Sequence, residues 1–248
     1  MATTKIEWTE ASWNPITGCT KISEGCKHCY AERMAMRLQA MGNPNYINGF
    51  SLTLHSHMLE LPLTWKSPRM VFVNSMSDLF HSDVPLAYIK KVFSIMAQAK
   101  QHTFQILTKR SERMAELAPQ LPWTPNIWMG VSVENQASIY RIEHLRTIRA
   151  SIRFLSCEPL LGSLGPLNLE KIDWIIVGGE SGPGARPMQE SWAIELREQC
   201  IQNKIPFFFK QWGGVNKKKA GRELQGKIWN QFPAYHHQRT DEGAVLCF

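Results

Sequence analysis

Short apolar runs alternate with amphipathic helical patterns along most of this 248-residue chain, and few folds accommodate that alternation. The runs are rich in β-branched and aromatic residues, and several are nearly continuous in apolar character, as in strands covered on both faces. An extended segment at 12–18 and an alternating segment at 50–54 precede runs at 70–74, 104–108, 127–133, 152–156, 174–178 and 206–210. Helical patterns lie at 85–99, 136–149 and 192–202, and another follows Cys29.

Strands that alternate with helices predict an α/β fold with a parallel sheet, either open or closed. About seven or eight strands suit a partial or complete TIM-like (βα) barrel. We expect residues 1–248 to form a single domain of this kind. We also expect a basic C-terminal extension at about residues 214–248.

Polar residues follow the predicted strands one after another. A glutamate comes shortly after three consecutive strands, as Glu134, Glu158 and Glu180. Strand carboxyl ends meet at one rim of a barrel, and that rim carries the active site in barrel enzymes. Hydration of loops accounts for some of these residues, but three glutamates in corresponding places favour a shared site. The expected cofactor-binding residues are Asn74, Ser75, Ser77, Asp78, Glu134, Glu158, Gly178, Gly179 and Glu180.

Three cysteines lie in the pattern Cys-x6-Cys-x2-Cys, as Cys19, Cys26 and Cys29. An odd number of thiols cannot all pair as disulfides, whereas three thiolates on one loop can ligate a metal centre with one open position. A 4Fe–4S cluster uses such ligands. Zinc prefers a complete tetrahedral set, for which His28 is a strained fourth donor. Both metals stay open as alternatives, and so do three unligated thiols. The cysteines that follow no spacing rule are Cys157, Cys200 and Cys247.

Basic residues also stand just beyond predicted strands, and the formal net charge of the chain is +7. Such residues would make a positive mouth that contacts phosphates, and an aromatic ring beside them would stack on a base. The alternatives are an ordinary charge pair at a helix start and a tryptophan in the core. The expected substrate-binding residues are Lys109, Arg110, Arg186, Lys210 and Trp212.

Composition narrows the class of protein further. Hydrophobic residues make up 44% of the chain, which is enough for a large core. No run approaches the roughly 18 consecutive apolar residues of a transmembrane helix, and the first residues lack the apolar core of a signal peptide. Six cysteines, three of them clustered, indicate a reducing compartment and metal binding rather than disulfides. We therefore expect a cytoplasmic protein with no membrane partner.

Long strings of the sequence point to a known family. They are Trp13-Asn14-Pro15, the cysteine loop, and residues 73–81, 107–110, 130–134, 155–162, 174–182, 185–188, 208–213 and 221–229. Together they resemble the phage-encoded three-cysteine-motif proteins, which are grouped with radical S-adenosylmethionine (SAM) enzymes. Those enzymes usually carry Cys-x3-Cys-x2-Cys, so the first gap is longer here. Their Gly-Gly-Glu motif occurs late, as Gly178-Gly179-Glu180, where it could instead line the substrate side or form a tight turn.

The resemblance implies a cofactor set and an activity. Cys19, Cys26 and Cys29 would ligate three irons of a 4Fe–4S cluster, and the fourth iron would bind SAM. An electron from a donor such as flavodoxin or ferredoxin would cleave SAM to methionine and a 5′-deoxyadenosyl radical, which abstracts hydrogen from the substrate. The superfamily's similarity to spore photoproduct lyase, together with the basic charge, favours nucleic acid, DNA rather than RNA, in lesion repair or base modification. It assigns no catalytic residue.

A second hypothesis comes from another class of protein. The same thiolates would hold zinc in a nucleic-acid-binding or adaptor protein without catalysis. Metal content separates the two, because an iron–sulfur protein is brown and a zinc protein is colourless.

Overall fold

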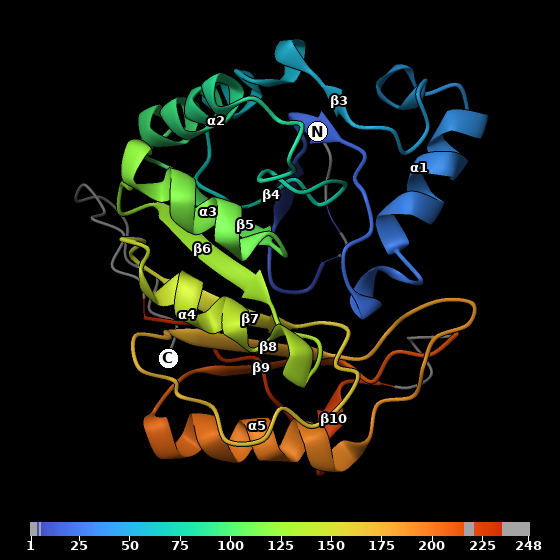
Figure 1. Ribbon diagram of the computed structural model, residues 1–248, viewed down its shortest axis with the longest axis vertical. Helices are drawn as coiled ribbons and strands as arrows, with labels where there is room; N and C mark the ends of the chain where they lie inside the picture. The colour runs from blue at the N-terminus through green and yellow to red at the C-terminus, as the bar shows by residue number, and fades with distance from the viewer. Residues whose placement is uncertain (1–3, 5, 216–220, 235–248) are drawn as a thin grey trace.

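The structure is a computed structural model that describes residue 4, residues 6–215 and residues 221–234. A sheet of seven parallel strands has the order β1-β4-β5-β6-β7-β8-β9. The strands are Ala11–Trp13 (β1), Met70–Val73 (β4), Thr103–Thr108 (β5), Ile127–Ser132 (β6), Arg153–Cys157 (β7), Trp174–Gly178 (β8) and Phe207–Gln211 (β9). The sheet curls into a half-barrel in which β1 and β9 are the edges (Figure 1). The expected fold class is confirmed in its partial form.

The helices lie mainly on one side of this sheet. They are Tyr30–Ala40 (α1), Leu86–Gln98 (α2), Ser111–Leu117 (α3), Tyr140–Arg146 (α4) and Glu190–Asn203 (α5). Figure 1 shows α2, α3, α4 and α5 around the outer side of the sheet, while α1 lies away from them. The helix expected at 136–149 begins as the 3-10 turn Gln136–Ser138 and is shorter than predicted. The sequence did not predict α3, whose seven residues are too few for a clear helical period.

The expectation of a sheet strand at 50–54 was wrong. Only Thr53–Leu54 (β3) is extended, and it pairs antiparallel with Ile16–Thr17 (β2) in a small separate sheet. Alternation over five residues indicates extended backbone but does not identify the partner strand. The second strand of the main sheet is therefore β4, and the connection from β1 to β4 carries the three cysteines and α1.

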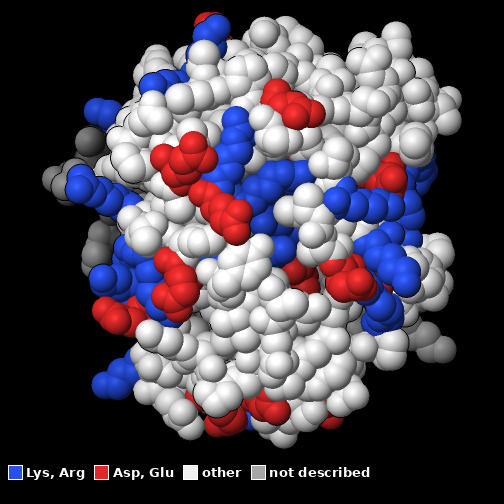
Figure 2. Space-filling view, in the orientation of Figure 1, with Lys and Arg blue, Asp and Glu red and all other residues white. Residues whose placement is uncertain are grey.

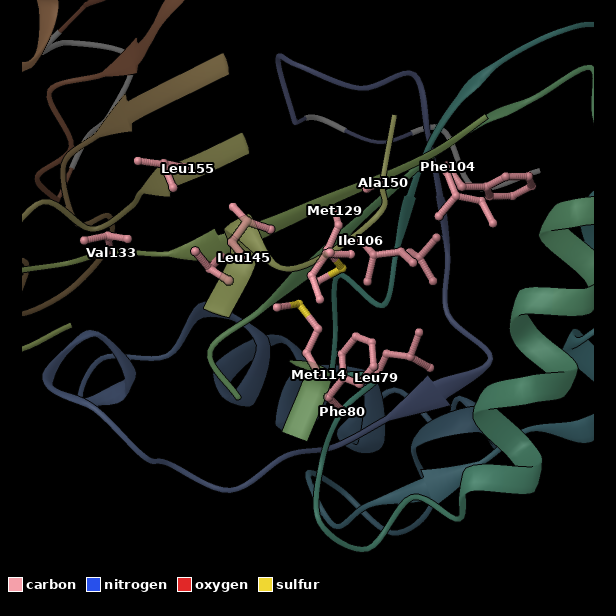
Figure 3. Close-up of a cluster of buried hydrophobic side chains, with 14 of the residues drawn as sticks. Leu79, Phe80, Phe104, Ile106, Met114, Met129, Val133, Leu145, Ala150 and Leu155 are labelled. Atoms are coloured by element: carbon pink, nitrogen blue, oxygen red, sulfur yellow. The ribbon is translucent and has the colours of Figure 1, made fainter. Parts of the chain in front are cut away.

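The outer face of the sheet packs under the helices. Successive strand residues point to opposite faces, and the outward set forms one apolar cluster with the helices. Figure 3 shows part of it, where Met114 of α3 and Leu145 of α4 meet Ile106 of β5 and Met129 of β6. Burial on this face accounts for half or more of the apolar residues in each strand.

A second apolar cluster, here called the concave floor, fills the inner face. Its members come from the strands and the segments before them, with none from the helices, which places the cluster inside the half-barrel. They are Trp8, Phe72, Trp128, Ile152, Phe154, Trp174, Ile176 and Phe208. Their rings meet edge to face, as between Trp128 and Trp174 at a centroid distance of 6.2 Å, which is a favourable geometry for aromatic pairs.

Two residues further along the strands, the same inner face becomes polar. Asn74 follows Phe72, Ser156 follows Phe154, and Lys210 follows Phe208. The inner face is thus an apolar floor beneath a set of polar residues at the strand carboxyl ends, here called the polar mouth. Its members, by strand alternation, are Asn74, Ser132, Glu134, Ser156, Glu158 and Lys210, and Gly178 occupies the corresponding position of β8.

The expected C-terminal extension at 214–248 falls partly outside the described residues, because 216–220 and 235–248 are among those not described. In the described part, Glu223–Leu224 (β10) and Lys227–Ile228 (β11) pair antiparallel, and β10 lies against α5 and β9. Across the described ranges, no helix combines the length and the apolar character needed to cross a membrane.

Gly130 on β6 tests how tightly the concave floor is packed. A Cβ built at this position would lie 2.4 Å from Cε2 of Phe154. We expect Gly130→Ala to lower the free energy of unfolding by about 1–3 kcal/mol, because overpacking displaces the ring. Urea unfolding followed by tryptophan fluorescence measures the change.

The matched control is Gly162→Ala. No described atom lies within 4 Å of a Cβ built at Gly162, so we expect a change within about 0.5 kcal/mol. Equal losses in the two variants would contradict tight packing at Gly130.

Candidate metal centre

The cysteine loop, residues 18–29, lies at the carboxyl ends of the strands. It begins at Gly18, whose amide donates to the backbone oxygen of Met76 at 3.1 Å. Gly18 has φ of +80°, and a Cβ there would lie 2.2 Å from the oxygen of Ser51, so this position requires glycine. The loop carries three free, half-buried thiols, those of Cys19, Cys26 and Cys29.

The three thiols share one electrostatic neighbourhood. The charge of Cys26 acts on Cys19, and the ammonium of Lys21 interacts with both Cys26 and Cys29. Cys29 directly precedes α1, where the free backbone N–H groups of a helix start favour negative charge. Burial, followed by the charge of Asp78, raises the pKa of the Cys19 thiol above its usual value.

Asp78, after β4, holds Arg110 against the first cysteine. Its Oδ1 accepts a hydrogen bond from Oγ1 of Thr108 at 2.7 Å, and its Oδ2 accepts one from Nη1 of Arg110 at 3.2 Å. The same Nη1 lies 3.4 Å from Sγ of Cys19, and Nη2 donates to the backbone oxygen of Thr20 at 3.1 Å. The Asp78 and Arg110 side chains are 8% and 11% exposed, so the ion pair is largely buried.

Glu134, after β6, anchors the middle of the loop. Its Oε1 accepts a hydrogen bond from Oγ of Ser23 at 2.8 Å and lies 3.4 Å from Nζ of Lys109. Its Oε2 accepts one from Nη1 of Arg141 at 2.9 Å. A Cβ on Gly25 would lie 2.5 Å from Oε1, so glycine permits this approach. Burial alone would raise the pKa of Glu134, but Lys109, Arg141 and Ser23 hold it below its usual value.

Glu180, after β8, holds the loop through Arg186. Its Oε2 accepts hydrogen bonds from N and Nε of Arg186, both at 2.9 Å, and its Oε1 accepts one from Nη2 at 2.6 Å. The Nη2 of Arg186 also donates to the backbone oxygen of Glu24 at 2.9 Å. Burial would raise the pKa of Glu180, but hydrogen bonds and charge from Arg186 lower it overall. Three carboxylates therefore fix the loop to three strand ends.

Glu158, after β7, forms an ion pair with Lys210 of β9 across the polar mouth. Its Oε1 lies 2.9 Å from Nζ of Lys210. A Cβ on Gly178 would lie 2.9 Å from this oxygen, and a Cβ on Gly179 would lie 1.9 Å from the backbone oxygen of Trp212. Close approach of neighbouring strand ends therefore explains both glycines without any ligand.

Trp212 packs on the outer side of the sheet. Its Nε1 donates to the backbone oxygen of Glu223 at 2.8 Å, and its ring meets Phe209 edge to face with centroids 4.8 Å apart. This placement accounts for the ring as part of the apolar packing, which the sequence allowed as an alternative. Base stacking by Trp212 stays a prediction.

Asn74 is buried with its amide unsatisfied. The side chain is 3% exposed, and neither Oδ1 nor Nδ2 has a hydrogen-bond partner among the described residues. Its φ of +60° is uncommon for a residue other than glycine. Ser75 and Ser77, by contrast, are satisfied, because their hydroxyls donate to Oδ1 of Asn14 and to the backbone oxygen of Ile16. An unpaired buried amide costs free energy, and strained backbone gathers at functional sites, so Asn74 is a strong candidate for contact with a bound ligand.

The sequence did not reveal Ser23, Arg141 or Arg33 as part of this site. Arg33 of α1 donates through Nη2 to the backbone oxygen of Ser181 at 2.7 Å and through Nη1 to that of Pro183 at 3.3 Å. It thereby ties α1 to the segment after β8. The position of Ser23 inside the cysteine loop was a usable signal. Arg33 carried none, because its partners are about 150 residues away in the sequence, whereas Arg141 lies only seven residues after its partner Glu134.

Three thiols are donors that either a 4Fe–4S cluster or a zinc ion can use. Within the described ranges, no group of three or more His, Cys, Asp or Glu side chains is placed to hold one ion, as a closed zinc site requires. A cluster takes one thiolate per iron, so its ligands need not converge on one point. A hydrogen-bond donor already lies beside one of the sulfurs, with Nη1 of Arg110 3.4 Å from Sγ of Cys19, and Oγ of Ser23 lies 3.6 Å from Sγ of Cys26.

The chain belongs to the family described as "Protein of unknown function (DUF5131)", whose model matches residues 3–233. No match was found among curated proteins. A spore photoproduct lyase mutant with bound AdoMet and dinucleoside spore photoproduct is similar at 11% identity and a TM-score of 0.49, over 71% of this chain and 57% of that chain. Spore photoproduct lyase complexed with dinucleoside spore photoproduct is similar at 9% identity and a TM-score of 0.47, over 81% of this chain and 63% of that chain. The chain thus spans less than two thirds of either lyase chain, and similarity this low says nothing about activity.

Glu134→Gln tests the anchoring of the loop. We expect the free energy of unfolding to fall by about 3–5 kcal/mol at neutral pH, because Arg141 loses its buried carboxylate partner. The folded-state pKa of Glu134 is lowered. Its contribution is therefore present above the unfolded pKa of about 4.3 and is lost as the pH falls through the folded pKa. Urea unfolding at neutral and acidic pH should show that wild type and variant converge in acid.

The matched control for this test is Glu170→Gln. Glu170 lies 3.9 Å from Lys171, and the two side chains are 68% and 59% exposed. We expect a change within about 0.5 kcal/mol at either pH. A Glu134→Gln effect as small as the control, or one that persists in acid, would count against the anchoring role.

Proposed function

We propose that the chain is a radical SAM iron–sulfur enzyme in which Cys19, Cys26 and Cys29 hold a 4Fe–4S cluster and SAM binds at its open iron. One observation carries the proposal: three free thiols lie on a loop that buried carboxylates fix at the polar mouth of a parallel half-barrel. With an electron from a donor such as flavodoxin or ferredoxin, the bound cofactors would supply reductive cleavage of SAM to methionine and a 5′-deoxyadenosyl radical.

The chain's own residues would bind and orient the cofactor and exclude water from it. Asn74 offers one donor and one acceptor that the described protein leaves unused. Glu158 and Lys210, paired at 2.9 Å, present both signs of charge, which suits the amino and carboxylate groups of an amino-acid moiety. Beneath them the fully buried rings of Trp174 and Phe208 keep the floor dry, which protects a reactive radical from side reactions.

The remaining predicted cofactor residues act in two ways in this proposal. Asp78, Glu134 and Glu180 place the cysteine loop through their ion pairs and hydrogen bonds, and so act on the cofactors indirectly. The other candidates shape the backbone at the mouth. These are Ser75, Ser77, Gly178 and Gly179.

The substrate we propose is nucleic acid, with DNA preferred over RNA, in lesion repair or base modification. The formal net charge of +7 supports a polyanionic partner. The cations expected to grip phosphates each have a carboxylate within 3.4 Å, so their charge is already partly compensated. These cations are Lys109, Arg110, Arg186 and Lys210.

Other cations beside the thiols are better placed for phosphate. Lys27, Arg33 and Arg37, on the cysteine loop and α1, form no ion pair with any described carboxylate. Figure 2 shows Lys and Arg side chains gathered over this part of the face, with Asp and Glu side chains next to them. Phosphate contact by these three cations would bring a strand of nucleic acid to the polar mouth.

Metal content is the first test of this proposal. Protein reconstituted under anaerobic conditions should be brown and bind about four irons per chain, and Cys19→Ala, Cys26→Ala or Cys29→Ala should abolish iron binding because each removes a ligand. Cys200→Ala is the control, since Cys200 is a buried thiol on α5, and it should retain iron. Iron and zinc analysis of each purified protein, together with its visible absorption spectrum, measures the metal content.

A colourless wild type with one bound zinc would replace the enzyme proposal with the zinc-stabilised nucleic-acid-binding or adaptor protein. Loss of iron from a folded Cys200→Ala protein would instead overturn the ligand assignment.

Salt-dependent binding tests the substrate class. We expect the protein to bind single-stranded or lesion-containing DNA more tightly than intact duplex, because a base must leave its stack to reach a buried reactive centre. Lys27→Gln should reduce the magnitude of the slope of log K against log salt by about 0.7 on single strands, since one phosphate contact is lost. Fluorescence anisotropy at several salt concentrations measures both effects.

Lys100→Gln is the matched control for that substitution, because Lys100 is exposed just before β5, at the opposite end of the sheet. Its slope should equal that of the wild type. No binding at low salt would exclude nucleic acid while leaving the cluster proposal intact.

A further inference from the structure

Arg110 gives one of the three thiols a cationic partner. It lies between β5 and α3, and its backbone N donates to Oγ1 of Thr108 at 2.9 Å. Its Nη1 reaches Sγ of Cys19 at 3.4 Å. The direct polar contact of Cys26 is with a neutral hydroxyl, that of Ser23 at 3.6 Å, and the ammonium of Lys21 acts on Cys26 and Cys29 through its charge without a hydrogen bond to either sulfur. The three thiols are therefore not equivalent, and the first carries a charge-assisted contact.

The guanidinium of Arg110 is held in a fixed orientation. Nη1 also donates to Oδ2 of Asp78 at 3.2 Å, and Nη2 donates to the backbone oxygen and Oγ1 of Thr20 at 3.1 and 2.9 Å. Oγ1 of Thr20 in turn lies 2.9 Å from Nε2 of buried His81. A planar fork engaged on both prongs cannot be reproduced by a lysine ammonium. The contact with Cys19 is thus part of a rigid network and not an incidental approach.

Burial gives this contact its strength. Arg110 is 11% exposed and Asp78 is 8% exposed, and charges interact more strongly away from water. Asp78 offsets part of the positive charge, yet it fixes the N–H that points at the sulfur. A hydrogen bond to a cluster sulfur, together with net charge nearby, is a recognised determinant of reduction potential.

We infer that Arg110 is a positioning residue that raises the reduction potential of the proposed cluster through Cys19. Reduction adds negative charge to the cluster and its thiolates, so a cationic N–H donor at one sulfur stabilises the reduced form more than the oxidised form. The inference rests on the proposed function, because it requires the cluster. As a consequence, the electron added on reduction would be favoured on the part of the cluster next to Cys19.

The test is a redox titration of reconstituted protein followed by electron paramagnetic resonance. Arg110→Gln should bind the cluster with a midpoint potential more negative than that of the wild type and with an altered spectrum of the reduced cluster. Arg110→Lys should fall between them, because it keeps the charge but loses the fork. Arg149→Gln is the matched control. It removes the same charge from an exposed residue before β7 and should leave the potential unchanged.

The outcomes separate this inference from the function on which it rests. A wild type that binds no iron ends both. Iron retained in all variants, with equal potentials in Arg110→Gln and Arg149→Gln, overturns the role of Arg110 and leaves the cluster assignment standing. Loss of iron from both Arg110 variants but not from Arg149→Gln also overturns it, because Arg110 would then hold the loop without setting the potential.

Discussion

Buried carboxylates at the strand ends determine where the cysteine loop lies. The loop contains little regular structure of its own, apart from the 3-10 turn Glu24–Cys26. Asp78, Glu134 and Glu180 reach it through one arginine, one serine and another arginine, respectively. A buried carboxylate without a partner is strongly destabilising, and these three are paired with Arg110, Arg141 and Arg186, which lie outside the loop. Arg110, Ser23 and Arg186 carry the contact from the carboxylates to the loop, which makes the candidate metal centre part of the fold.

The same strands build two chemically different environments, because their side chains alternate between faces and change in polarity along the inner face. On β8 the inner positions run from Trp174 through Ile176 to Gly178. The bulky residues close the bottom of the half-barrel, and the absent side chain of Gly178 leaves room for Glu158. A dry floor beneath paired charges suits chemistry that must keep water away from a reactive centre while still binding a polar cofactor.

The sequence predicted the sheet well because a strand buried on both faces has a strong local signature. The six runs from 70–74 to 206–210 match observed strands to within one or two residues. The segment at 50–54 failed because alternation reports extended backbone and not a pairing partner. The gathering of polar residues at one rim followed from topology. Their individual partners did not, because the reach of Arg186 back to Glu24 across the curled sheet has no local signal.

The basic residues near the thiols fall into two groups, those paired with carboxylates and those without a carboxylate partner among the described residues. Arg110 and Arg186 are committed to carboxylates and to the loop backbone, so in the proposed function phosphate contact would fall to cations that have no carboxylate partner. One of these, Arg33, donates to the backbone oxygens of Ser181 and Pro183. A phosphate at Arg33 would compete with those carbonyl oxygens for the same N–H groups. In the proposed enzyme, substrate contact would therefore act on the junction between α1 and the segment after β8, next to the thiols. Substrate binding would thus affect the position of the cofactor through the guanidinium of Arg33.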